Sequence, residues 1–231
     1  MSDRAGEGRA YSNLGVTLTS RGDFQTALQY LQLGLNIAKQ NGNRPTEGSA
    51  YANLGDAYRS LGDLSKAEQC FKSSVRILDS IRDHLQKDEW KISLRNHHKH
   101  PYTALWNVQL LQNKIGEALL SAEWGRAQAL MDLMESHYGL KLKQPGSDVQ
   151  METFEEILNY ITSEIVFLAV GPDAINFWVL HASKECQFVK IRICNEECTE
   201  GSARNTLKTL KDAAYAKIGV KKVSSAPRTI P

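Results

Sequence analysis

The sequence is short of several residue types that would mark particular classes of protein. Its 231 residues include only four cysteines and six prolines. Four scattered cysteines cannot form the disulfide framework of a small secreted scaffold in a chain of this length. Charge of one sign is also lacking, because 28 Lys and Arg face 26 Asp and Glu and the formal net charge is +2. A surface this balanced produces no strong field, so we expect neither nucleic acid nor a membrane as a partner.

Long apolar runs and targeting signals are missing as well. The longest apolar run, Ile165–Val170, is far shorter than the roughly 20 residues that a membrane-spanning helix needs. The first ten residues contain two acids and no apolar stretch, which is not the pattern of a secretory signal. With 42% hydrophobic residues, the chain can build a folded core, and we expect one or two domains in the cytoplasm.

What the sequence does contain is an internal repeat of forty residues. Of the 39 pairs from Asp3/Asn43 to Asn41/Ile81, 14 are identical, where average composition would give about two or three. In the first copy the identical positions are Arg4, Glu7, Gly8, Ala10, Tyr11, Asn13, Leu14, Gly15, Ser20, Gly22, Asp23, Ala27, Gln29 and Ile37. The repeat predicts two copies of one structural unit.

Each copy has the pattern of a helical hairpin. Tyr11, Leu14 and Leu18 have the spacing of one helical face, and the second copy repeats that spacing. Gly15 lies inside this first helix, where glycine costs about 1 kcal/mol relative to alanine, so we expect close approach of the partner helix there. The pair Gly22-Asp23 then supplies a turn and an N-cap for the second helix.

The order of Leu-Gly, an aromatic three residues on, Gly-Asp and Ala resembles the tetratricopeptide repeat in its forty-residue variant. The resemblance covers residues 3–82 and implies a mainly α protein that begins with an α-solenoid of stacked hairpins. A third, degenerate hairpin follows an insertion, with Tyr102 aligned on Tyr51 and Ala118 on Ala67. Trp106 replaces the close-contact glycine and Lys114-Ile115 the Gly-Asp turn, so looser packing is expected there.

The second half of the chain no longer follows the repeat pattern. Together the segments 87–95 and 117–134 resemble the junction between such repeats and a CHAT domain, a caspase-like module. Within that class they are most similar to the tetratricopeptide repeat protein 28-like family. The capping box Ser147-x-x-Gln150 opens a predicted helix to about Tyr160. Three β-type runs at 165–170, 175–181 and 187–194 predict an antiparallel meander, and 203–217 a further helix.

The fold class expected from these patterns is therefore a mainly α protein, a repeat solenoid followed by a small, incomplete α/β segment. The expected domains are two repeats at 3–82, an insertion and third hairpin at 83–139, a linker at 140–146, the start of a CHAT-like domain at 147–220 and a tail at 221–231. A complete CHAT domain needs well over a hundred further residues, so we interpret the sequence as a partial chain.

Three groups of side chains could indicate chemistry, and we predict no catalytic or metal role for any of them. His181 and Cys186 flank one predicted turn, with no orienting group or oxyanion donor in sight. Cys194 and Cys198 have no second ligand pair at suitable spacing for zinc. The tract His97-His98-x-His100 could bind a metal but fits an exposed loop before Pro101. No phosphate-binding glycine loop is present, so no cofactor is expected.

The stronger functional pattern is a peptide-binding groove. First helices of stacked repeats line a concave surface, and Asn13 and Asn53 occupy the same place in two of them. In peptide-binding relatives an asparagine there contacts the backbone of an extended ligand, and its amide offers both a donor and an acceptor. Val16, Asp56 and Arg59 would flank this pair. An ordinary solvated role for the two asparagines stays open, and Ala104 at the matching third position leaves only two rungs.

Two functions follow as hypotheses. The first is a non-enzymatic adaptor that binds a peptide or partner domain in the groove. The second is a fragment of a CHAT-class cysteine peptidase whose catalytic segment is missing from this sequence. We favour the adaptor; the resemblance implies cytoskeletal or centrosomal scaffolding, and an unpaired edge of the meander would favour self-association.

Overall fold

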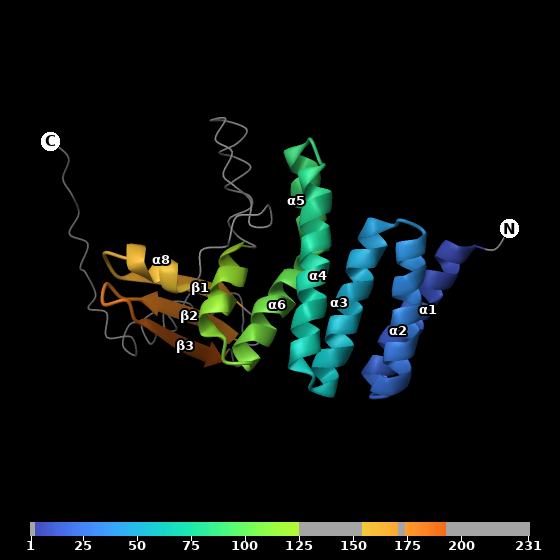
Figure 1. Ribbon diagram of the computed structural model, residues 1–231, viewed down its shortest axis with the longest axis horizontal. Helices are drawn as coiled ribbons and strands as arrows, with labels where there is room; N and C mark the ends of the chain where they lie inside the picture. The colour runs from blue at the N-terminus through green and yellow to red at the C-terminus, as the bar shows by residue number, and fades with distance from the viewer. Residues whose placement is uncertain (1–2, 125–153, 171–173, 193–231) are drawn as a thin grey trace, which may run out of the picture. The chain divides into compact units, whose positions relative to one another are not determined.

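The computed structural model describes residues 3–124, 154–170 and 174–192. The chain divides into two compact units, Met1–Met151 and Glu152–Pro231, and each is described by itself below. The described part of the first unit is helical, and the described part of the second combines one short helix with a sheet (Figure 1). The predicted fold class, a repeat solenoid followed by a small antiparallel β segment, is confirmed.

The first unit opens with four helices: α1 (Arg4–Arg21), α2 (Phe24–Gln40), α3 (Arg44–Leu61) and α4 (Leu64–Asp83). Helix α1 packs on α2, α2 on α3 and α3 on α4, so the four rods lie side by side in chain order (Figure 1). The two helical hairpins predicted from the forty-residue repeat are therefore present.

Each hairpin is held together where a glycine of the first helix meets a large side chain of the second. A Cβ on Gly15 would lie 2.5 Å from Cγ of Leu31, and a Cβ on Gly55 would lie 2.6 Å from Cε1 of Phe71. Both large side chains are fully buried. The close approach expected at these glycines is confirmed, and burial of a Leu or Phe side chain contributes roughly 1.5–3 kcal/mol.

The turn between the helices of each hairpin uses the predicted Gly-Asp pair. Gly22 and Gly62 have φ of 85° and 89°, in the left-handed region that glycine adopts without strain. Asp23 and Asp63 follow as N-caps, and each carboxylate accepts a hydrogen bond from the backbone N–H three residues on. These two residues end one helix and begin the next within a single turn.

The third hairpin follows helix α5 (Asp88–His97) and consists of α6 (Lys99–Leu111) and a helix at residues 115–124. Its turn lies at Asn113-Lys114, one residue before the predicted Lys114-Ile115. Asn113 has φ of 60° and replaces the glycine of the earlier turns, because asparagine tolerates the left-handed region better than other non-glycine residues.

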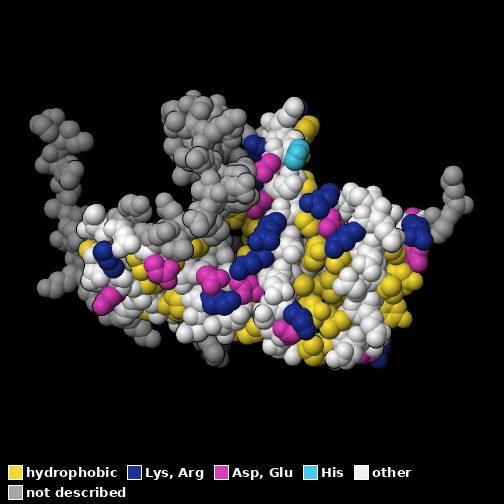
Figure 2. All heavy atoms as spheres, viewed as in Figure 1, with side chains coloured by type: hydrophobic (Ala, Val, Ile, Leu, Met, Phe, Trp, Pro, Cys, Tyr) yellow, Lys and Arg dark blue, Asp and Glu magenta, His cyan; other side chains and the backbone are white. Residues whose placement is uncertain are grey.

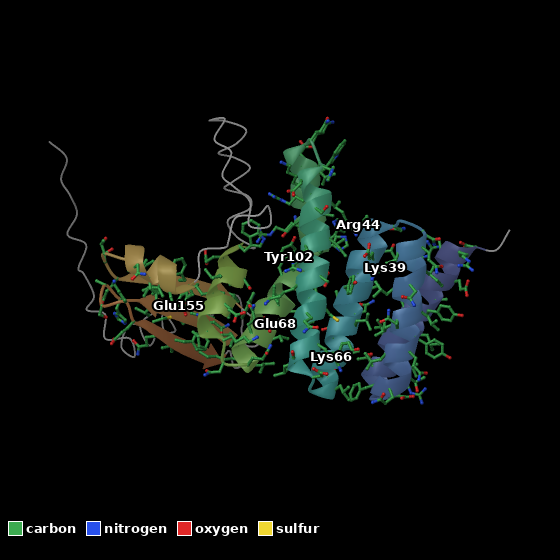
Figure 3. All side chains as sticks on the ribbon, in the orientation of Figure 1. Lys39, Arg44, Lys66, Glu68, Tyr102 and Glu155 are labelled. Atoms are coloured by element: carbon green, nitrogen blue, oxygen red, sulfur yellow. The ribbon has the colours of Figure 1, made fainter. Side chains whose placement is uncertain are left out.

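The third hairpin is bound to the second through a buried carboxylate on α4. Glu68, only 4% exposed, accepts from Nζ of Lys72 and of Lys114, both at 2.7 Å. Gln109 of α6 and Gln112, the C-cap of that helix, donate to it at 3.3 and 2.9 Å. Burial alone would raise the pKa of Glu68, but the hydrogen bonds from Lys114, Lys72 and Gln112 outweigh it and hold the pKa at about 2. Figure 3 labels this side chain between α4 and α6.

The second unit contains α8 (Phe154–Tyr160) and the strands β1 (Ile165–Val170), β2 (Ala174–Leu180) and β3 (Cys186–Arg192). Within the described residues the sheet has the order β1-β2-β3, and both pairings are antiparallel. The predicted meander is confirmed. Its second and third strands each begin one residue before the predicted position, β2 ends one residue earlier, and residues 193–194 predicted for the third strand lie outside the described residues.

The central strand is buried on both faces. All seven residues of β2 are buried, as expected from a strand with apolar residues on both faces, and the one polar residue among them is Asn176. Strand β1 differs, because Val166, Leu168 and Val170 are 43%, 40% and 63% exposed. The predicted capping box at 147–150, the helix at 203–217, the linker and the tail lie outside the described residues, and the predicted domain boundaries stay predictions.

Candidate peptide-binding groove

The predicted asparagine pair borders one hollow on the surface of the repeats. The hollow has a volume of about 280 Å³ and lies where α1, α3 and the start of α6 meet. Asn13 contributes from α1 and Asn53 from α3, so the structure brings the two predicted rungs together. Other polar residues that line it are Arg9, Ser12, Thr46, Ser49 and His98.

Both asparagines are placed by the buried core beneath them. Each lies two residues before a close-contact glycine, Gly15 or Gly55, whose side of the helix faces the hairpin partner. Neither side-chain amide forms a hydrogen bond with another described residue. Asn13 is exposed and Asn53 half-buried, so both amides remain available to a ligand.

The electrostatics of the hollow are weakly positive. Arg9 is the one formally charged side chain among its lining residues, and no Asp or Glu lines it. His98, which links α5 to α6, has its pKa lowered by burial and then by the neighbouring His97, so it is neutral at neutral pH. The hollow therefore accepts polar or acidic groups more readily than basic ones.

The three predicted flanking residues lie elsewhere and do not line the hollow. Val16 is 43% exposed on α1. Asp56 and Arg59 form an ion pair across one turn of α3, with Oδ1 and Nη2 2.9 Å apart. His100 of α6 adds a second contact, because its Nε2 lies 3.3 Å from Oδ2 of Asp56. These charges are therefore engaged with one another.

The histidine tract contributes to the site in a way that the sequence did not predict. The expected loop is wrong, because His97 ends α5 and His100 lies in the first turn of α6, although both are exposed as expected. Pro101 is tolerated in that turn, where its missing N–H would have no helical partner. The alignment of Tyr102 on Tyr51 also aligns His100 with Ser49, which lines the hollow. This was the one signal in the sequence that could have placed the tract near the groove. Ala104, aligned with Asn53, is buried and provides no third rung.

The other chemical candidates do not assemble into a reactive site. The ring of His181 lies 3.0 Å from Oε1 of Glu164, while burial raises the pKa of the Cys186 thiol and so disfavours the reactive thiolate. Cys194 and Cys198 lie outside the described residues. Over residues 3–124, 154–170 and 174–192, no group of three or more His, Cys, Asp or Glu side chains could hold a metal ion.

Comparison with known proteins agrees with the helical hairpins. Residues 6–80, which span α1 to most of α4, match the family model described as Tetratricopeptide repeat. A search of curated proteins found no match. Repeats of this family commonly mediate protein–protein interaction and are generally non-enzymatic scaffolds. None of the described helices is long and apolar enough to cross a membrane.

Proposed function

We propose that this chain is a non-enzymatic adaptor that holds an extended peptide of a partner protein along α1 and α3. The observation that carries the proposal is the pair of uncommitted amides, Asn13 and Asn53, at one hollow of about 280 Å³. An amide can donate to a peptide carbonyl and accept from a peptide N–H at the same time. Two such groups in register on neighbouring helices suit a ligand that runs across them.

Binding through this pair should be modest and sensitive to loss of the amides. Each net hydrogen bond contributes about 0.5–1.5 kcal/mol, so replacing both asparagines by alanine should weaken binding about 5- to 150-fold. The test compares proteins recovered by the wild-type chain with those recovered by the Asn13→Ala/Asn53→Ala variant. Circular dichroism checks that helicity is unchanged.

A matched control keeps this test specific. Asn36→Ala/Asn41→Ala removes two exposed amides from α2 and its C-cap, away from the hollow. A partner of the groove is lost with the first pair and retained with the second. Equal recovery of every partner by all three chains would contradict the proposal.

The family resemblance supplies the finer parts of the proposal. On that resemblance we propose a cytoplasmic role in cytoskeletal or centrosomal scaffolding, with residues 147–220 as the start of a CHAT-like domain. The helix and three-stranded meander of the second unit support that interpretation. Imaging of the tagged chain against a centrosomal marker tests the placement, and diffuse signal throughout the cell would contradict it.

A peptidase function is the weaker proposal. His181 is engaged with Glu164 and the Cys186 thiol is held in its neutral form, so a cysteine peptidase would need its nucleophile and base from elsewhere. An open reading frame beyond Pro231 that encodes such a pair would support this alternative.

A further inference from the structure

A second pocket lies on the repeats and shares no residue with the groove. It has a volume of about 250 Å³ and is enclosed by α4, α6 and the helix at residues 115–124. A ligand in this pocket would therefore not contact the lining of the proposed peptide groove. Its size is below the roughly 300–1,000 Å³ of pockets for drug-sized ligands, so it suits one large side chain.

One part of the wall of this pocket is apolar and fixed in place. Val75, Leu105 and Trp124 contribute from the three helices, and the first two are almost fully buried. The indole N–H of Trp124 donates to Oδ2 of Asp79 at 3.0 Å, and the hydroxyl of Tyr102 donates to Oδ1 at 2.6 Å. One carboxylate thus orients two aromatic rings before any ligand arrives (Figure 3 labels Tyr102). A preformed apolar pocket costs a ligand little ordering.

A buried acceptor belongs to the same pocket. Gln109 lines it and is only 1% exposed. Its Nε2 donates to Glu68, but its Oε1 has no hydrogen-bond partner in the part of the chain that the structure describes. Buried acceptors are rarely left unpaired in folded proteins. For an entering donor to satisfy this acceptor, the Gln109 side chain must turn its Oε1 towards the pocket.

One cation at the pocket has no ion-pair partner among the described residues. Arg76 lines it from α4, is exposed and forms no ion pair with a described residue. Lys72 is engaged by Glu68 at 2.7 Å and lies 3.6 Å from Glu117. Figure 2 shows Lys and Arg beside Asp and Glu side chains over α4 and α6. The guanidinium of Arg76 therefore favours a ligand that carries an anionic group beside the side chain that enters the pocket.

We propose that this pocket receives a tryptophan or tyrosine side chain that neighbours an acidic residue in a partner protein. The aromatic ring fills the space between Val75, Leu105 and Trp124. The N–H or O–H at its tip donates to Gln109, and the acidic neighbour meets Arg76. Tryptophan and tyrosine combine an apolar body with a donor and dominate the binding energy of many interfaces.

N-acetyltryptophan tests the proposal, because it joins an indole N–H to a carboxylate. Titrated into the full chain and followed by NMR, it should give saturable shifts at Val75, Leu105 and Trp124. N-acetyltryptophan amide, which lacks the charge, should bind about two- to fivefold more weakly, as expected for an exposed ion pair. N-acetylnaphthylalanine, similar in area but without the N–H, should also bind more weakly. Equal affinity for all three probes would overturn the proposal.

Two variants locate the contact. Arg76→Gln should remove the preference for the carboxylate, whereas Arg21→Gln, at an exposed arginine of α1, should leave it unchanged. Ser121→Trp fills the pocket from its wall and should abolish the shifts. If that variant loses helicity, the Arg76 comparison decides alone, since Arg76 is exposed. A carboxylate preference that persists in Arg76→Gln, shifts that persist in a folded Ser121→Trp chain, or shifts confined to the groove of Asn13 and Asn53 would refute this site and leave the adaptor proposal standing.

Discussion

At the scale of single residues, small and large side chains are matched across each hairpin. Gly8 and Gly34 of the first hairpin let α1 and α2 approach, and Ser12 lies against Gly34. In the second hairpin Ser74 replaces Gly34, and its hydroxyl donates to the carbonyl of Gly48 at 2.7 Å. The two copies thus keep one backbone geometry with different side chains, because what each position fixes is space and hydrogen bonding.

Gly55→Ala should destabilise the chain. The added methyl would lie 2.6 Å from the buried ring of Phe71, and overpacking of this kind costs about 1–3 kcal/mol. Alanine recovers up to about 1 kcal/mol of helix propensity. We therefore expect the free energy of unfolding in urea, followed by circular dichroism, to fall by about 1–2 kcal/mol.

Gly48→Ala is the control in the same helix. Its Cβ would lie 3.4 Å from the nearest atom, on Ile77, which is ordinary contact. The variant should be as stable as the wild type or more stable by up to about 1 kcal/mol, since only the propensity term remains. If both variants lost the same free energy of unfolding, close packing against Phe71 would not be the reason for glycine at position 55.

At the scale of elements, the third hairpin lacks the capping aspartate of the first two hairpins and has another contact in its place. Lys114 stands where Asp23 and Asp63 cap the earlier helices, but its side chain has no acceptor and cannot cap a backbone N–H. Instead its ammonium group reaches Glu68 on α4. A contact between hairpins here takes over from a local cap.

Glu68→Gln should therefore weaken the attachment of the third hairpin. Removing the charge deprives Lys72 and Lys114 of their shared partner, although both remain partly exposed. Loss of charge-assisted hydrogen bonds should lower the free energy of unfolding by about 1–3 kcal/mol at pH 7. Urea unfolding of both chains measures the difference.

The effect should depend on pH with a definite sign. In the folded chain the pKa of Glu68 is about 2, below the roughly 4.3 of an unfolded glutamate. The carboxylate therefore stabilises the fold above the unfolded pKa, and this stabilisation is lost as pH falls towards 2. The gap between wild type and variant should shrink over that range. A gap that stays constant from pH 7 to pH 2.5 would contradict the assignment.

Local signals in the sequence predicted most of the hairpins, but not the contacts made after the insertion. The hairpins were predictable because the close-contact glycine, the Gly-Asp turn and the capping aspartate are all local signals. The Asn113 turn was misplaced by one residue because no glycine marks it. In the site, Asn13 and Asn53 followed from the repeat period. His98 did not, because it lies after an insertion whose packing no period determines.

At the scale of the molecule, the described parts build separate cores. One cluster joins α2 to α3 around Leu31 and Leu54, and another joins α4 to α6 around Phe71 and Val108. The sheet has a cluster of its own around Phe177. Contacts between neighbouring hairpins stabilise a solenoid step by step, and the second hairpin contributes to both sites, through α3 to the groove and through α4 to the second pocket.

The sheet should also make the chain self-associate. Val166 and Val170 of β1 are exposed apolar side chains on one face, opposite Val179 and Ile175 of β2. No charged residue or proline protects this strand, and such strands favour association. Val170→Lys, at the more exposed position, should shift sedimentation velocity profiles towards the monomer.

Gln187→Lys provides the matched control, since it adds the same charge at an exposed position on β3, on the same face as Val166 but beyond β2. It should leave the association unchanged, because Gln187 adds no exposed apolar surface. If both lysines reduced association equally, general charge repulsion would be the cause rather than contact through β1. A wild-type chain that sediments as a monomer at high concentration would mean that these valines are not an interface between copies.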